Sequence, residues 1–330
     1  MLHTVPREDL DALVQHEPRA LSDALEQGRI VYFPSCPIAL PEEAELSFLR
    51  EEIGPNLRRK NVSWYFDRDR VKGLETAPVV AERAHRLLRE HAARVRELLT
   101  RAMPEFSRGW TPGTTSVRPF QEKGRALSAH ASNELVHVDA GAYGATHGDR
   151  VLRFFVNINP REDRVWVSRG AFPELFAAHG REAGIAGEPA DPIVGTPMIG
   201  TQSSSPQRGR NDPVREGPFD RAFTSVVNAG ARLAPALKMI DSSPYDRLMR
   251  RFHNWMKDTP SFRDSQVGLQ TFRFPPLSAW MVLTDQVSHA CIEGQHALID
   301  TFIVPLANCR LRELSPYEIL RAQRAPDART

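Results

Sequence analysis

The positions of apolar and polar residues predict helices in the first third of the chain. The longest is expected over Pro78–Met103, where apolar residues recur at steps of three and four and Pro104 follows. A short helix over Pro18–Gln27 would end at Gly28, and another is predicted over Pro41–Ile53, which has glutamates in its first turn. The N-terminal part of the chain is therefore expected to be mainly helical.

Farther along, apolar runs of strand length replace the helical pattern. The best of them is Val151–Asn159, in which only Arg153 interrupts the apolar residues before the end. Strands are predicted at Arg29–Phe33, Ser116–Arg118, Val151–Asn159, Arg164–Val167, Leu277–Thr284 and Ala297–Leu306.

Helical periodicity returns at Ala222–Ala229 and at Pro244–Lys257, and a capping box from Ser315 to Glu318 predicts a last helix. The stretch Gly180–Pro218 differs from both kinds of element, because it is rich in glycine, proline and serine. A stretch of this kind inside a compact domain is either disordered or a lid, and its sequence does not decide between them.

These elements predict an α+β protein in which a mostly β sandwich core carries a helical cover. One domain is expected over residues 1–330, with a helical N-terminal part over residues 1–115. The β core would occupy residues 116–310 and hold an insert at residues 180–257. Residues 311–330 would form the C-terminal helix and tail.

Composition narrows the class of protein. The chain has 330 residues, of which 41% are apolar and 25% charged, as in soluble globular proteins. Its net charge of +2 gives no indication of nucleic-acid binding. The three cysteines, Cys36, Cys291 and Cys309, are scattered, which argues against a disulfide framework or a zinc ribbon. Without a signal-peptide pattern or an apolar run of about 20 residues, a cytoplasmic protein is expected, and peripheral membrane contact stays open.

The first candidate chemistry is the tripeptide His137-Val138-Asp139. On a strand, residues i and i+2 point to the same face, so the imidazole and the carboxylate would project together. With one more histidine they would form the 2-His-1-carboxylate set that binds Fe(II) and leaves positions open for oxygen chemistry. The same spacing recurs at His147 and Asp149, but the glycines around that copy indicate a turn. A surface histidine is the alternative for the first copy.

The third ligand is sought among the later histidines. His289 follows an apolar strand and is flanked by small residues, which gives an imidazole the access that a metal needs. His253 lies off the apolar face of its helix or at the edge of that face, and His296 follows a turn. His289 is therefore preferred, with a buried structural histidine as the alternative.

The segment Leu57–Leu74 is basic and aromatic and lacks helical periodicity. It is either a solvated loop or the rim of an anion-binding site. Its cations are Arg58, Arg59, Lys60, Arg68, Arg70 and Lys72, and Trp64, Tyr65 and Phe66 lie among them. This combination suits phosphate groups at a membrane surface.

Several segments, in order along most of the chain, resemble the Kdo hydroxylases. These are Fe(II)/2-oxoglutarate oxygenases that hydroxylate 3-deoxy-D-manno-oct-2-ulosonic acid (Kdo) in lipopolysaccharide. The segments are RKNVS at 59–63, HVDA at 137–140, RVLRFFVNINP at 150–160, RVW at 164–166, FPPLSAWMVLTDQVSHA at 274–290, GQHALIDTF at 294–302 and SPYEIL at 315–320. The resemblance implies a double-stranded β-helix, or jelly roll, with His137, Asp139 and His289 as the metal ligands. It also implies Fe(II), 2-oxoglutarate and dioxygen as cofactor and co-substrates.

The distal carboxylate of 2-oxoglutarate needs a buried cation, preferably the two-donor fork of arginine. No arginine lies between His289 and Arg310, so Arg153 is the first candidate and Arg118 the second, unless Arg153 faces solvent. Gln295 and Thr301 are candidates for additional hydrogen bonds. Substrate contacts are expected from the basic segment and the loop after the metal pair, at Arg58, Arg59, Lys60, Asn61 and Tyr143.

The substrate implied by the resemblance is Kdo in the lipopolysaccharide inner core or in Kdo-lipid A, hydroxylated at C3. An enzyme for this glycolipid would work at the cytoplasmic face of the inner membrane. Two alternatives stay open. One is the same iron chemistry on an amino acid, a secondary metabolite or another small acidic substrate, and the other is a non-catalytic jelly-roll binding protein. The sequence does not indicate an oligomeric state.

Overall fold

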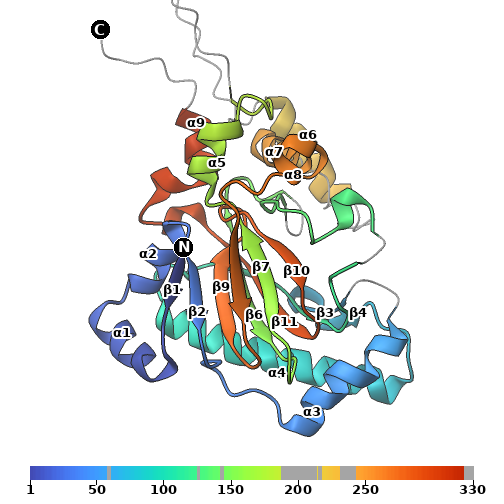
Figure 1. Ribbon diagram of the computed structural model, residues 1–330. Helices are drawn as coiled ribbons and strands as arrows, with labels where there is room; N and C mark the ends of the chain where they lie inside the picture. Colours follow the sequence, from blue (N-terminus) through green and yellow to red (C-terminus); the bar gives the residue numbers. More distant parts are fainter. Residues whose placement is uncertain are drawn as a thin grey trace, which may run out of the picture.

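The fold was analysed in a computed structural model, which describes residues 1–57, 61–124, 127–141, 145–186, 214, 218–230 and 243–322. Two β-sheets face each other at its centre (Figure 1). The large sheet has the order β1 (Leu2–Thr4), β2 (Ile30–Phe33), β9 (Ala279–Leu283), β6 (Arg150–Asn157), β11 (Ala297–Val304), β5 (Thr111–Arg118), β3 (Val62–Tyr65) and β4 (Arg70–Lys72). The small sheet has the order β10 (Ala290–Glu293), β7 (Arg164–Ser168) and β8 (Gln270–Phe274). Neighbouring strands are antiparallel except β1 and β2.

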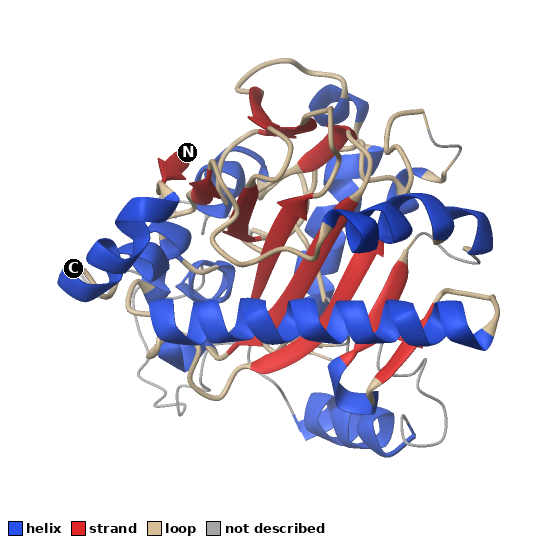
Figure 2. Cartoon of the chain, turned by 90° about the horizontal axis from the view of Figure 1, so that it is seen from below, coloured by secondary structure: helices blue, strands red, loops and turns tan. Residues whose placement is uncertain are grey.

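Helices cover the sheets on one face and at one end. They are α1 (Leu10–His16), α2 (Ala20–Glu26), α3 (Glu43–Ser47), α4 (Pro78–Ala102), α5 (Phe172–His179), α6 (Pro218–Gly230), α7 (Pro244–Asp258), α8 (Pro260–Arg263) and α9 (Pro316–Ala322). Figure 2 shows α4 lying across the outer face of the large sheet. Helices α5 to α9 gather beyond the ends of the strands (Figure 1). None of the helices in the described ranges is long and apolar enough to cross a bilayer.

Three apolar clusters hold these layers together. The largest lies between α4 and the large sheet and contains Leu88, Val95 and Phe154. A second fills the space between the sheets, where the rings of Phe155 and Trp280 stack with centroids 5.1 Å apart. The third lies under α5, α7 and α9 at the end of the sandwich. The expected β core with helical cover is thereby confirmed.

The long helix and the central strands begin and end within a few residues of the predicted positions. The predicted helix over Pro41–Ile53 is wrong in detail, since α3 begins at Glu43 and passes into one π-helical turn. The predicted short strand Ser116–Arg118 is the last part of the eight-residue β5. The segment Leu57–Leu74 is not simply a loop, because it contains the β3–β4 pair at the edge of the large sheet.

Other elements were not anticipated. The strands β1, β8 and β10 and the helix α5 have only three to eight residues each, which is too short for a clear periodic pattern. Because β1 to β4 belong to the large sheet, the first 115 residues are not only helical. Of the stretch Gly180–Pro218, the part up to residue 186 forms turns after α5 with Ala183 and Ile185 buried. Nearly all the rest lies outside the described residues.

Candidate metal centre and its pocket

The His137–Asp139 segment is not a strand, contrary to the expectation. It is an extended piece of chain with one isolated antiparallel bridge, between His137 and His289. His137 N donates to His289 O at 3.1 Å, and His289 N donates to His137 O at 2.8 Å. Asp139 N donates to Thr284 O at 2.8 Å. These backbone bonds fix the tripeptide against the turn that follows β9.

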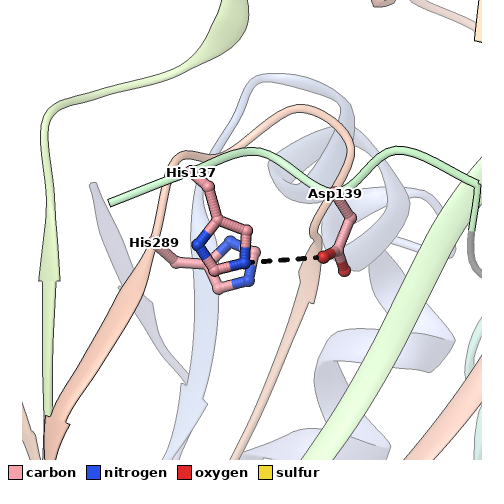
Figure 3. Close-up of side chains that lie close together, drawn as sticks. All are labelled: His137, Asp139 and His289. Carbon is pink, nitrogen blue, oxygen red and sulfur yellow. Dashed lines mark ion pairs between the residues drawn. The ribbon is translucent and has the colours of Figure 1, made fainter. Parts of the chain in front are cut away.

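The residue alternation that was expected of a strand is nevertheless present. Val138 and Ala140 are buried in the apolar cluster under α7. His137 and Asp139 therefore point the other way, toward His289 (Figure 3). An extended backbone is enough to produce this alternation, and regular strand pairing is not required.

The donor atoms of the three residues converge. His137 Nε2 lies 3.8 Å from Asp139 Oδ1, and one ligand atom from each of the three residues lies within 4.8 Å of the others. Within the described part of the chain, this is the only group of at least three His, Cys, Asp or Glu residues arranged to hold a metal ion. The donor set and its spacing fit a 2-His-1-carboxylate site.

The other nitrogen of each imidazole is held by a backbone carbonyl. His137 Nδ1 lies 2.7 Å from Leu135 O, and His289 Nδ1 lies 2.9 Å from Val287 O. A ring nitrogen that faces a carbonyl carries the proton, so the Nε2 lone pair of each ring is directed into the site. The ring of Trp166 stacks on His289 with centroids 5.1 Å apart and fixes its plane.

The protonation states of the three residues suit metal binding. Burial lowers the pKa of both His137 and His289, so the imidazoles are neutral at neutral pH. Burial alone would raise the pKa of Asp139, but Arg153 and the two imidazoles bring it well below its usual value. Arg153 Nη2 lies 2.9 Å from Asp139 Oδ2. Asp139 therefore stays ionised, as a metal ligand must.

The three residues open into a pocket of about 420 Å³ between the sheets and α7. Four cationic side chains line it, Arg118 and Arg153 from the large sheet and Arg250 and Lys257 from α7. Among the described lining residues, Asp139 is the only carboxylate. A pocket with this excess of positive charge suits ligands that carry carboxylate or phosphate groups.

Arg118 and Arg153 also have buried hydrogen-bond donors that a bound anion would satisfy. The buried Nε of each guanidinium has no hydrogen-bond partner within the described residues. Arg118 Nη1 lies 3.4 Å from Glu122 Oε1, and Glu122 also accepts from Arg164 at 3.2 Å. An incoming carboxylate would supply the missing acceptors and would fit the fork of either arginine.

The other residues predicted to contact co-substrate or substrate either do not line the pocket or lie outside the described residues. Thr301 pairs with Arg153 across β11 and β6 and is buried, but it does not line the pocket. Gln295 lies in the turn between β10 and β11, outside the lining. Asn61 donates from Nδ2 to Ser63 Oγ at 3.1 Å, beside the start of β3. Arg58, Arg59, Lys60 and Tyr143 lie outside the described residues.

Helix α7 supplies pocket residues that the sequence interpretation did not assign to the site. Arg250, His253 and Lys257 all line the pocket, and the ring of His253 meets that of His137 with centroids 4.8 Å apart. The sequence signal that could have identified these three residues is their spacing of three and four residues beside the apolar stripe of Tyr245–Met256. The sequence pattern had placed His253 off the apolar face of the helix or at its edge.

The chain is similar to proteins of one known family. A family model described as 3-deoxy-D-manno-oct-2-ulosonic acid (Kdo) hydroxylase matches residues 9–325. Similar solved structures include that of the Kdo hydroxylase KdoO, a non-heme Fe(II) α-ketoglutarate-dependent dioxygenase, in complex with cobalt(II). It is 25% identical, covers 97% of this chain and 95% of that chain, and gives a TM-score of 0.75.

The KdoO complex with α-ketoglutarate and Fe(III) is 24% identical with the same coverage and a TM-score of 0.74. Among curated proteins, no match was found. The likeness to KdoO confirms the expected jelly-roll fold. Because the family match extends over nearly the whole chain, the protein belongs to the Kdo hydroxylase family.

Proposed function

We propose that this protein is an Fe(II)- and 2-oxoglutarate-dependent hydroxylase whose substrate is Kdo in a glycolipid, with C3 as the hydroxylated carbon. The observation that carries the proposal is the convergence of His137, Asp139 and His289 at the wall of a cationic pocket, in a chain of this family. Bound there, Fe(II) would combine 2-oxoglutarate, dioxygen and a C–H bond to give succinate, carbon dioxide and an alcohol.

The protein residues divide this work among themselves. His137 and His289 would present neutral Nε2 atoms to the metal, and Asp139 would supply the anionic ligand. Arg153 is the first choice for the distal carboxylate of 2-oxoglutarate, and Arg118 is the second. Thr301, the cross-strand neighbour of Arg153, would support it from β11. Gln295 has no part in this proposal.

The glycolipid would approach along the edge of the large sheet. Val62 pairs with Val117, which places Asn61 at the level of Arg118 on the neighbouring strand. The basic residues 58–60 directly precede this point in the sequence. We propose that these basic residues, with Asn61, contact lipid phosphates at the cytoplasmic face of the inner membrane.

The function is tested by turnover. With added Fe(II) and dioxygen, the protein should convert 2-oxoglutarate to succinate, and Kdo-containing lipid A should raise this rate and gain one oxygen atom. The same assay with amino acids and small organic acids tests the alternative substrates. Conversion of 2-oxoglutarate without oxygenation of any Kdo compound would contradict the proposed substrate, and no conversion at all would support a binding protein.

Reversing the charges of Arg58, Arg59 and Lys60 to glutamate should weaken binding to anionic lipid vesicles by roughly 1 kcal/mol per charge. Activity on Kdo-lipid A should fall with it. Decarboxylation of 2-oxoglutarate without substrate should stay nearly unchanged, because the metal ligands are untouched. Vesicle co-sedimentation and the two activity assays measure these effects. An equal loss of both activities would contradict the prediction.

A further inference from the structure

Helix α7 carries a polar stripe beside its apolar one. Arg250, His253 and Lys257 follow one another at steps of three and four residues, so they lie along one face of the helix. All three line the pocket, whereas Met249 and Phe252 from the adjacent face are buried in the apolar cluster below. The helix is thus fixed by its apolar stripe and presents the polar stripe to the metal centre.

Each member of the stripe is held by a backbone carbonyl of the chain that forms the site. Arg250 Nη2 donates to Ala140 O at 2.8 Å, and His253 Nδ1 lies 2.7 Å from Val138 O. Lys257 Nζ donates to His130 O at 3.1 Å and to Ser132 O at 2.9 Å. These contacts set the positions of the three side chains before any ligand arrives.

Lys257 is the member whose situation calls for a ligand. Its residue is 2% exposed, yet no carboxylate in the described ranges forms an ion pair with it. Burial lowers its pKa to about 8, so the ammonium is mainly charged at neutral pH. Two carbonyls use two of its three N–H donors. A buried ammonium with a remaining donor beside a pocket is a site for an anion.

We propose that Lys257, flanked by Arg250, binds the carboxylate of the sugar-acid substrate and thereby orients the sugar toward the metal. This inference rests on the proposed function and identifies the part of the pocket that recognises the acid. The carboxylate could also come from 2-oxoglutarate, but Arg118 and Arg153 on the large sheet already offer that co-substrate two guanidinium groups, each with a buried Nε that has no partner within the described residues. The helix side of the pocket remains for the substrate.

The position of His253 supports the assignment of the substrate carboxylate to the helix side of the pocket. Its ring packs edge-on against His137 at an interplanar angle of 73°. A carboxylate held on the stripe would therefore lie beside a metal ligand, with the attached sugar at the centre. No other described acidic side chain lines the pocket to compete for Lys257, since Asp139 is taken by Arg153 and the metal position.

The test is a binding measurement on the full chain loaded with Fe(II) and 2-oxoglutarate under argon, where turnover cannot start. Two probes are titrated calorimetrically, the methyl glycoside of Kdo and its neutral carboxamide. Wild-type protein should prefer the carboxylate by roughly 10- to 100-fold, as a charge-assisted hydrogen bond provides. Lys257→Met should bring the two probes to similar affinity, and Lys257→Arg should restore much of the preference.

Arg251→Met is the matched control, since Arg251 is exposed on the same helix and donates to Gly184 O at 2.8 Å. It should keep the full preference. Affinity for 2-oxoglutarate should be unchanged in Lys257→Met, and thermal melting checks that the variant is folded.

Two results with the Lys257→Met variant would overturn the subsite while leaving the proposed function intact. One is an unchanged carboxylate preference in Lys257→Met, and the other is a loss of 2-oxoglutarate affinity instead. If the wild type oxidises lipid A but binds both probes equally, the subsite is likewise wrong. If the wild type neither binds nor oxidises any Kdo compound, the proposed substrate fails first and the subsite fails with it.

Discussion

Replacement of Asp139 by alanine is expected to abolish turnover, to below about 1% of the wild-type rate, and to weaken Fe(II) binding by more than about 100-fold. Asp139 is the only anionic member of the converging set, and its loss leaves two neutral imidazoles beside the cation of Arg153. A divalent ion would then meet net positive charge. Calorimetric titration with Co(II) and the succinate assay measure the two effects. Turnover near the wild-type level would disprove the assignment of Asp139 as a ligand.

The control is Asp149→Ala, which removes the carboxylate of the second His-x-Asp copy. The glycines around this copy predict a turn, and from that position alone the change would be nearly silent. The structure revises this expectation, because Asp149 Oδ1 accepts a hydrogen bond from Leu306 N at 2.9 Å. The substitution should cost about 1–3 kcal/mol of unfolding free energy while metal binding and turnover of the folded protein persist. Loss of metal binding there would mean that the wrong pair had been chosen.

The candidate metal ligands could be selected from the sequence because their chemistry is local. Two ligands lie two residues apart, and an extended backbone aligns them whether or not it pairs as a strand. His289 stood out because small residues surround it after a strong strand. The strand predicted for His137 and Asp139 was nevertheless wrong. Their tripeptide is fixed by backbone hydrogen bonds to His289 and Thr284, which are distant in the sequence. Such pairing leaves no periodic pattern.

The polar stripe of α7 escaped prediction for a similar reason. Its spacing is visible in the sequence, but only the fold shows that the stripe faces the metal centre rather than solvent. His253 and Lys257 become pocket residues because the apolar stripe of α7 packs on Val138 and Ala140, the residues that alternate with the candidate metal ligands. Short strands such as β8 and β10 gain their stability from the sheet rather than from their own sequences.

Replacement of Arg153 by leucine should raise the apparent KM for 2-oxoglutarate, and loss of a charge-assisted contact of this kind corresponds to about 2–5 kcal/mol. Arg153 is favoured over Arg118 by its electrostatic surroundings. Glu122 lies beside both Arg118 and Arg164, so the charge of Arg118 is already partly compensated. Among the described carboxylates, only Asp139 lies within ion-pair distance of Arg153. A bound metal ion would share the negative charge of Asp139, so the charge of Arg153 would be less compensated.

The same reasoning predicts that Arg153→Leu keeps its metal affinity or gains some, since a cation beside Asp139 is removed. The diagnostic result is therefore a raised KM for 2-oxoglutarate together with Co(II) binding at least as tight as in the wild type. Both are measured on the folded variant, by steady-state succinate formation and by calorimetry. Arg118→Leu is the matched comparison, because Arg118 lines the same pocket and also has an unsatisfied Nε. If Arg118→Leu raises the KM and Arg153→Leu does not, the two arginines exchange roles, and Arg153 is left to hold Asp139 in place.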